Sequence, residues 1–332
     1  MTAFSRRLLG LLVLLLGLGL AACGGREPAT TPPSQTPDAM PALAAVSLKT
    51  GERLQVVATT NLVADVVKNI GGTDIDLAAL LPIGADPHGY SPTPQDLRAV
   101  AGAQVVFVNG LGLESFLDEM LANAGGDAVV VAVSAGIDPL EMAEAHEGEA
   151  HEGEEHGDTD PHVWFSVPNV ITWTQNIEAA LIGLDPAHAA DYTSRATDYR
   201  AQLTGLDQDL RQMVAQIPGE QRKLVTDHRT FTYLAHEYGF DQTGAVVDSF
   251  STLSQSSAQS LAALQEQIRA AGAKAIFVGN TVNPALATQI SQDLGIQIVP
   301  VFTDSLSPAD GPAGTYVEFM RYNMGAIVGA LK

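Results

Sequence analysis

Short apolar runs alternate along this chain with segments whose apolar residues recur at helical spacing. Unbroken apolar strands that alternate with helices predict parallel sheets covered by helices on both faces. The runs expected to form strands are 54–60, 75–81, 103–109, 128–133, 223–226, 245–247, 275–278 and 296–302. The segments expected to form helices are 62–70, 94–100, 231–238, 261–271 and 317–331. The pattern therefore predicts an α/β fold.

Two of these helices begin with residues that commonly cap helices. Asn61 is expected to cap the first, which Gly71 and Gly72 end. Thr93 is expected to cap the second, and Pro94 follows at the first helical position, where a missing N–H group costs nothing.

A longer amphipathic helix lies between the two halves of the chain. Its apolar positions advance in steps of four and three: Tyr192, Ala196, Tyr199, Leu203, Leu206, Leu210, Met213 and Ile217. This stripe covers about eight turns, on the order of 40 Å. Such a helix can pack against both halves as a strut, although a surface helix of one domain would show the same stripe. We expect an N-terminal lobe over 51–187, a linking helix over 188–217 and a C-terminal lobe over 218–332.

The N-terminus has the pattern of an export signal. Arg6 and Arg7 precede the apolar run 8–20, which is too short for a comfortable membrane span. The sequence Leu-Ala-Ala before Cys23 resembles a bacterial lipobox, which implies cleavage after residue 22 and lipid on Cys23. The alternative is an ordinary signal peptide with a chance cysteine. A tether over 23–50, rich in Pro, Thr, Ser and Ala, follows.

The charge of the chain limits its partners. Formal net charge is −21, from 17 basic and 38 acidic residues. A chain of this sign repels phosphate backbones, which argues against nucleic-acid binding. The acidity is compatible with attracting cations, but it is equally a common solubility feature. Cys23 is the only cysteine in the sequence, so neither a disulfide framework nor a thiolate metal site is expected.

One tripeptide occurs twice, as Asp86-Pro87-His88 and as Asp160-Pro161-His162. His228 and Asp304 are two further polar sites that follow expected strands, where α/β folds place binding residues. Proline restricts the backbone before each of the two imidazoles. Three imidazoles and one carboxylate from separate stretches are the inventory of a four-coordinate metal site. We therefore expect His88, His162, His228 and Asp304 to bind a metal ion.

This set of donors favours zinc and favours carriage over catalysis. Three neutral imidazoles suit Zn²⁺, at Zn–N distances of about 2.0–2.1 Å. Cu²⁺, Ni²⁺ and Co²⁺ would also be accepted, whereas Mn²⁺ prefers more oxygen ligands. Four protein donors leave no open position for an activated water, and the sequence has neither a His-Glu-x-x-His motif nor an evident general base beside the donors.

A run rich in His, Glu, Asp and Gly occupies residues 144–159. It is too charged and too rich in glycine to fold alone. We expect His146, His151 and His156 to collect Zn²⁺ weakly and pass it to the nearby His162, although a solvated loop with no role would have the same composition. His188 and His236 are expected to be structural.

Several stretches together resemble a known family: 86–96, 109–114, 160–164, 228–239 and 302–305. At these residues the chain resembles the solute-binding lipoproteins of bacterial zinc/manganese ABC importers, in family order over nearly all of the chain from about residue 54. The resemblance implies two α/β lobes joined by one long rigid helix, with the metal in the cleft between them. His88 and His162 would come from the N-terminal lobe, and His228 and Asp304 from the C-terminal lobe.

Two features of the resemblance point to a zinc-type member. Manganese-type members tend to place Glu at the third ligand position, where this chain has His228, and zinc-type members often carry a His-rich acidic insertion. Gly279-Asn280 departs from the family, in which Glu is common there, and is expected to lie off the metal.

The resemblance implies a monomer that is lipid-anchored at the outer face of the cell membrane, at the cell surface or in the periplasm. It would capture Zn²⁺ with high affinity and deliver it to an ABC permease and its ATPase. Three alternatives remain: the same role for Mn²⁺ or Fe²⁺, a zinc-dependent hydrolase with a metal-bound water and a carboxylate base, and an adhesin displayed on the tether.

Overall fold

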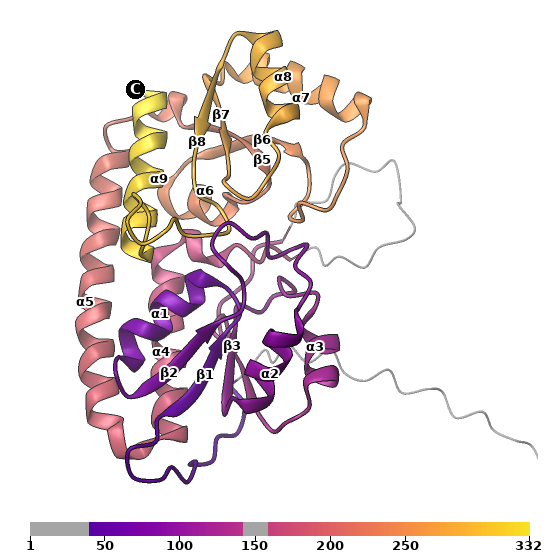
Figure 1. The fold of residues 1–332 in the computed structure, drawn as a ribbon. Coiled ribbons are helices and arrows are strands. Elements are labelled where there is room, and N and C mark those ends of the chain that lie inside the picture. Colours follow the sequence, from indigo (N-terminus) through magenta and orange to yellow (C-terminus); the bar gives the residue numbers. More distant parts are fainter. Residues whose placement is uncertain (1–39, 142–158) are drawn as a thin grey trace, which may run out of the picture. The chain divides into compact units, whose positions relative to one another are not determined.

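The computed structural model describes residues 40–141 and 159–332. Within these ranges the strands form two parallel sheets of four strands each (Figure 1). The first sheet consists of β1 (Leu54–Ala58), β2 (Ile75–Ala79), β3 (Val105–Val108) and β4 (Val129–Ala132). The second consists of β5 (Lys223–His228), β6 (Asp241–Val247), β7 (Ala275–Val278) and β8 (Gln297–Pro300). The expected α/β fold with two lobes is confirmed.

Helices flank both sheets. Those of the first lobe are α1 (Asn61–Gly71), α2 (Pro94–Gly102), α3 (Leu117–Ala124) and α4 (Val167–Leu184), and those of the second are α6 (Thr232–Tyr238), α7 (Ala258–Ala271), α8 (Ala285–Leu294) and α9 (Tyr316–Leu331). The apolar pattern did not predict α3, α4 or α8. In α4, eight of 18 residues are buried and the remainder includes further apolar residues, so no clear polar face marks it as a helix.

The two sheets share one strand order, β2-β1-β3-β4 and β6-β5-β7-β8. The chain therefore leaves the first strand of each sheet toward one edge and then crosses back to build the other side. In open parallel sheets, ligands bind beyond the carboxyl ends of the strands at such a reversal point. A binding site is therefore expected in the loops that follow β1, β3, β5 and β7 and in the loops beside them.

The start of α1 differs from the expected one. Thr60, not Asn61, caps the helix: its Oγ1 accepts a hydrogen bond of 3.1 Å from the backbone N–H of Val63. Both residue types are good caps, but the side chain of Asn61 is bound to the segment that follows β8, with the backbone N–H of Leu306 donating to its Oδ1. The end of α1 at Gly71 and the cap by Thr93 on α2 are as expected.

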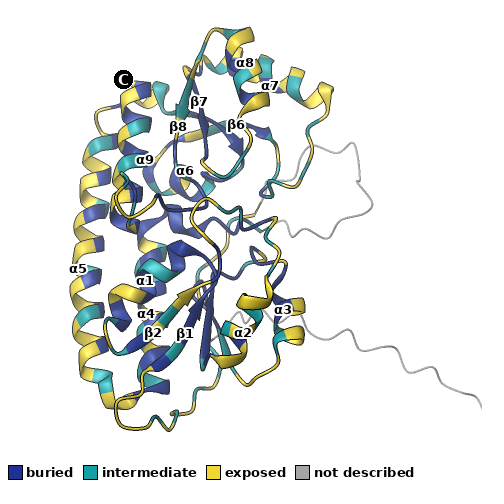
Figure 2. Ribbon diagram, in the orientation of Figure 1, coloured by how far each residue is buried: buried dark blue, intermediate teal, exposed yellow. Residues whose placement is uncertain are grey.

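The long helix α5 (Ala189–Val214) packs against α1 and α4 of the first lobe and against α6 and α9 of the second (Figure 1). Its apolar stripe is buried and its other side is exposed (Figure 2). The helix ends at Val214, so Ile217, which was expected to close the stripe, is buried in the turn beyond it.

The hydrophobic core is continuous from one lobe to the other. A single cluster of buried side chains includes the inner face of the first sheet, the stripe of α5 and α9. The aromatic rings of Phe165, Phe231 and Phe319 pack on one another within it, with Phe165 4.7 Å from Phe231 and 5.5 Å from Phe319 between ring centroids. A shared core of this kind opposes large hinge motion between the lobes.

Among the described helices, none combines the length and the apolar character that crossing a membrane requires.

Candidate metal centre

Four donors expected from the sequence lie together at the carboxyl ends of the strands. His88 is in the loop between β2 and α2, and His162 directly precedes a short 3₁₀ helix, Val163–Phe165. His228 is the last residue of β5, and Asp304 follows β8. All four side chains are buried, and His88, at 7% exposure, is the most accessible. We call this set (His88, His162, His228 and Asp304) the four-donor cluster.

The distances within the four-donor cluster are those of a coordination shell. The Nε2 atom of His162 lies 3.3 Å from Nε2 of His88 and 3.3 Å from Nε2 of His228. The Oδ1 atom of Asp304 lies 3.6 Å from Nε2 of His162 and 3.8 Å from Nε2 of His228. One ligand atom from each residue can be chosen so that all lie within 4.8 Å of one another. Nitrogen atoms about 2.0–2.1 Å from a tetrahedral metal are about 3.3–3.4 Å apart, which matches the two N–N distances of 3.3 Å.

The two carboxylate oxygens of Asp304 differ in their hydrogen bonding. Its Oδ2 accepts hydrogen bonds from the hydroxyls of Thr281 (2.9 Å) and Thr303 (2.7 Å). Its Oδ1 is buried and has no hydrogen-bond donor among the described residues. A buried carboxylate oxygen without a donor is costly, and a cation among the imidazoles would remove that cost. The residues therefore fit a bound metal ion.

Two further carboxylates orient the imidazoles. Oδ1 of Asp160 lies 2.7 Å from Nδ1 of His162, and Oδ1 of Asp227 lies 2.6 Å from Nδ1 of His228. An ionised carboxylate only accepts hydrogen bonds, so Nδ1 carries the proton and the Nε2 lone pair faces the other donors. The repeated Asp-Pro-His motif thus supplies its own orienting carboxylate at Asp160, a role that sequence reasoning missed, as it missed Asp227.

The same motif fixes the backbone before each histidine. Oδ1 of Asp160 accepts a hydrogen bond of 2.9 Å from the N–H of His162, and Oδ1 of Asp86 accepts one of 3.0 Å from the N–H of His88. The second oxygen of Asp86 accepts a hydrogen bond of 2.5 Å from the hydroxyl of Thr252, which belongs to the second lobe. The tripeptide is therefore a turn closed by its own aspartate. This hydrogen bond, together with the proline, fixes the backbone before each histidine.

The electrostatics of the cluster favour positive charge at its centre. Burial lowers the pKa of His228, but the charges of Asp227 and Asp304 outweigh it and raise this pKa to about 9. Burial raises the pKa of Asp304, but the imidazoles, His228 above all, hold it below its ordinary value. The surroundings thus stabilise an ionised Asp304 beside a cation, whether that cation is a proton on His228 or a metal ion.

The motif Asn109-Gly-Leu-Gly-Leu-Glu114 supports the second Asp-Pro-His turn through hydrogen bonds. Asn109 Nδ2 donates to the backbone carbonyl of Pro161 at 3.0 Å. The buried carboxylate of Glu114 in turn accepts from the N–H of Asn109 (2.7 Å) and from the hydroxyl of Thr59 (2.6 Å). Burial raises the pKa of Glu114. Sequence reasoning used this motif for the resemblance but assigned no role to these residues.

Gly279-Asn280 lies beside the site without being part of the four-donor cluster. The N–H of Gly279 donates to Oδ2 of Asp227 at 2.5 Å. A Cβ atom at this position would lie 2.1 Å from Oγ1 of Thr303, so no larger residue fits without moving Thr303. The position lies off the donors, as expected, but it contributes to holding Asp227 and hence His228.

The other residues considered from the sequence lie elsewhere. His188 Nδ1 lies 2.7 Å from Asp185 Oδ2, and His236 is on the exposed side of α6. Both lie away from the four-donor cluster. The signal segment, Cys23 and the loop histidines His146, His151 and His156 fall outside the described residues.

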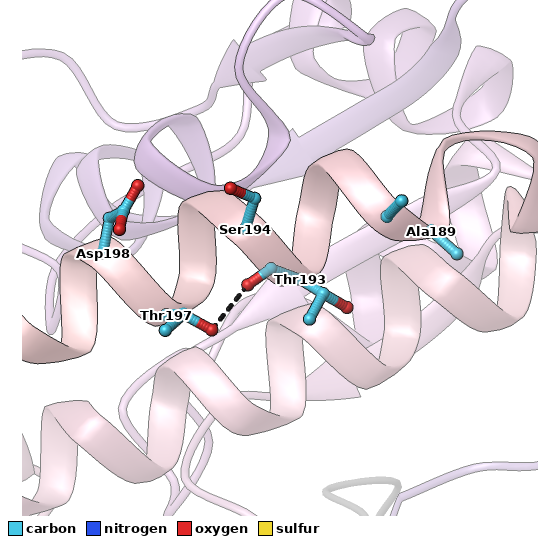
Figure 3. A pocket seen from close by; sticks show the side chains of 6 residues that line it. Ala189, Thr193, Ser194, Thr197 and Asp198 are labelled. Atoms are coloured by element: carbon cyan, nitrogen blue, oxygen red, sulfur yellow. Dashed lines mark hydrogen bonds between the residues drawn. The ribbon is translucent and has the colours of Figure 1, made fainter.

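A surface hollow along α5 offers no comparable donors (Figure 3). It is lined by Ala189, Ala190, Thr193, Ser194, Thr197 and Asp198. The hydroxyl of Thr197 is already bound to the backbone carbonyl of Thr193 at 2.8 Å. A single helix supplies all of this lining, and nothing in it competes with the four-donor cluster as a binding site.

Changing Asp227 to Asn is expected to weaken metal binding by about 10- to 100-fold, the usual cost of losing an outer partner of a metal-bound histidine. The amide keeps the size of the side chain, but an N–H donor facing Gly279 N–H cannot repeat the 2.5 Å contact of Oδ2. Competition with a chromogenic chelator measures the change. Asp248→Asn, on an exposed carboxylate of the same lobe, is the matched control and should bind like wild type.

The sequence matches one family model over residues 56–330, described as zinc-uptake complex component A, periplasmic. The manganese-binding lipoprotein MntA of Halalkalibacterium halodurans is 30% identical over 320 residues, which cover 96% of each chain. The periplasmic zinc-binding protein TroA of Treponema pallidum superimposes with a TM-score of 0.75 at 31% identity, over 84% of this chain and 99% of its own. A manganese-bound periplasmic metal-binding protein of Candidatus Liberibacter asiaticus superimposes with a TM-score of 0.74 at 26% identity, over 85% of this chain and 100% of its own.

Proposed function

Because this chain belongs to the family of the periplasmic zinc-uptake component A, we propose that it captures Zn²⁺ at the four-donor cluster and delivers it to an ABC permease for import. The observation that carries this proposal is the cluster itself: three imidazole nitrogens and one carboxylate oxygen, buried together, with four of the distances between them at 3.3–3.8 Å and all within 4.8 Å.

At the coarser level, the chain is the substrate-binding component of a metal ABC transporter and works outside the cytoplasm. Such a component has a permease and an ATPase as partners. The family binds metal for uptake and does not consist of enzymes, so the hydrolase alternative is not retained. We further propose that lipid on Cys23 anchors the chain to the membrane.

The donor set supports Zn²⁺ over Mn²⁺ as the cargo. Nitrogen-rich four-coordinate shells suit Zn²⁺, whereas Mn²⁺ favours carboxylate, carbonyl and water oxygens. Against this, the relative MntA is named as manganese-binding and a structural neighbour holds Mn²⁺. The same role for Mn²⁺ is therefore the second candidate.

The surrounding residues define how the cargo would be held. Asp160 and Asp227 keep the Nε2 lone pairs of two imidazoles turned inward. Their negative charges, with that of Asp304, offset the charge of a divalent ion in a buried site. Access is easiest beside His88, where Asp86 of the first lobe meets Thr252 of the second. The shared core of the lobes favours a modest opening there over a large hinge motion.

Calorimetric titration of the metal-stripped chain 50–332 tests the proposal. We expect one tight Zn²⁺ site, and we expect the Zn²⁺-loaded protein to retain its metal against roughly tenfold excess Mn²⁺. Weak additional Zn²⁺ binding that disappears on deletion of residues 144–158 would support a collecting role for His146, His151 and His156. Displacement of Zn²⁺ by Mn²⁺ would establish the manganese role instead, and the lack of any tight site would overturn both.

A further inference from the structure

Helix α1 of the first lobe presents two polar side chains to the second lobe, one turn apart. Nδ2 of Asn61 donates to Oγ of Ser305 at 3.0 Å, and its Oδ1 accepts from the N–H of Leu306 at 2.8 Å. Oδ2 of Asp65 accepts from the N–H of Tyr316, at the start of α9, at 2.9 Å. Residues four apart share one face of a helix, so one face of α1 binds both ends of the segment between Asp304 and α9.

Further groups of the first lobe bind the residues on either side of Asp304. The indole Nε1 of Trp164 donates to the carbonyl of Thr303 at 2.9 Å, and the N–H of Gly84 donates to Oγ of Ser305 at 2.7 Å. From the second lobe, Asn280 accepts a hydrogen bond of 3.3 Å from the N–H of Thr303 and donates one of 3.3 Å to the carbonyl of Ser305. Asn323 of α9 binds both backbone groups of Phe302, at 2.9 and 2.8 Å, and Thr281 donates to the carboxylate of Asp304 at 2.9 Å. The segment around Asp304 is therefore held by hydrogen bonds from both lobes.

His228 differs from Asp304 in this respect. Asp227, which orients its ring, and Thr226, whose hydroxyl donates to its carbonyl at 2.5 Å, both belong to β5. Its neighbour in the sheet, Val247, belongs to β6. The polar contacts of His228 outside the four-donor cluster thus come from the second lobe.

We propose that Asn61 is a positioning residue for metal binding, which fixes Asp304 to the first lobe. Asp304 is then tied to the lobe that carries His88 and His162 as well as to its own, whereas the polar contacts of His228 outside the four-donor cluster come from the second lobe alone. This inference rests on the proposed metal-binding function. A donor that is fixed before the metal arrives loses less freedom on binding, which increases affinity without a direct contact to the metal.

The test compares Asn61→Ala with Asn69→Ala, the same substitution at an exposed position of the same helix. We expect Asn61→Ala to weaken Zn²⁺ binding by about tenfold, within the range for outer partners, and Asn69→Ala to leave it unchanged. Ser305→Ala, which removes the oxygen that accepts from both Asn61 and Gly84, should give a similar loss while leaving α1 intact. The absorption spectrum of bound Co²⁺ provides a second readout, because altered bands report a change in the geometry of the donors.

A double-mutant cycle with Asp304→Ala separates positioning from general stability. If Asn61 acts through Asp304, the loss caused by Asn61→Ala disappears when Asp304 is already alanine. An undiminished loss in that background, or wild-type affinity and an unchanged Co²⁺ spectrum in Asn61→Ala, would overturn the inference. The Zn²⁺ titration of the wild-type protein distinguishes failure of this inference from failure of the proposed function. A wild-type protein without a tight metal site would overturn the proposed function itself.

Discussion

Replacing His228 with alanine is expected to weaken Zn²⁺ binding by more than the roughly 10- to 100-fold that the loss of an outer partner costs. The substitution removes one of the four donors, and it also leaves the buried carboxylates of Asp227 and Asp304 without their shared positive neighbour. The uncompensated buried charge lowers the stability of the metal-free fold, whereas the weaker Zn²⁺ binding comes from the missing donor.

Chelator competition measures the Zn²⁺ affinity of His228→Ala, and thermal denaturation with and without Zn²⁺ shows whether the variant still folds. His236→Ala is the matched control, because His236 lies on the exposed side of α6, eight residues further along the chain. The control should retain wild-type affinity. If His228→Ala binds Zn²⁺ as tightly as the control, His228 is not a donor and the four-donor cluster is not the metal site.

The parts of the fold that the sequence predicted are those where local pattern and burial agree. Strands β3 and β7 are continuous apolar runs, β1 is interrupted only by Gln55, and all three are buried along nearly their full length. The stripe of α5 was visible because one side of that helix is solvent-exposed. Helix α4 was not predicted, because it lies between other elements and carries apolar residues on several sides, which makes its helical period weak.

The cap of α1 shows why helix ends are harder to predict. Thr60 and Asn61 are adjacent, and both have side chains that can cap a helix. The choice is decided by Leu306, 245 positions away in the chain, whose N–H binds Asn61. No local rule contains that contact, and it is also the contact that gives Asn61 its proposed role at the metal site.

The donors of the candidate site could be predicted, but the residues that orient them could not. His88, His228 and Asp304 are residues of metal-binding type at or after the end of a strand, and strand ends in parallel sheets converge. His162 was singled out by the repeated Asp-Pro-His tripeptide. Asp227 is next to His228 in sequence and resembles any loop carboxylate there. Its role depends on two hydrogen bonds to His228 and on the N–H of Gly279 from the neighbouring strand, and only the folded sheet brings these groups together.

At the proposed metal site, protons and metal ions compete for His228, because an imidazole must be neutral to bind a metal. In the metal-free protein its pKa is raised from 6.5 to about 9, against the effect of burial, by Asp227 and Asp304. At neutral pH, Zn²⁺ therefore has to displace a proton. Below pH 9, each unit by which the pH falls should reduce the apparent Zn²⁺ affinity about tenfold. Because His228 is already half protonated at pH 9, we expect a loss of about 500-fold between pH 9 and pH 6.

The stability of the metal-free protein should fall as the pH rises, whereas the Zn²⁺ affinity increases. A raised pKa in the folded state means that protonated His228 stabilises the fold fully below its ordinary value of 6.5, and that this contribution is lost as pH rises toward about 9. Melting temperatures measured from pH 6 to pH 9 should therefore show a growing stabilisation by Zn²⁺. Asp227→Asn, which removes the nearest charge, should flatten the upper part of the affinity profile. Zn²⁺ affinity that is constant over this range in the wild-type protein would mean that His228 binds no proton in the metal-free state, and would overturn this prediction.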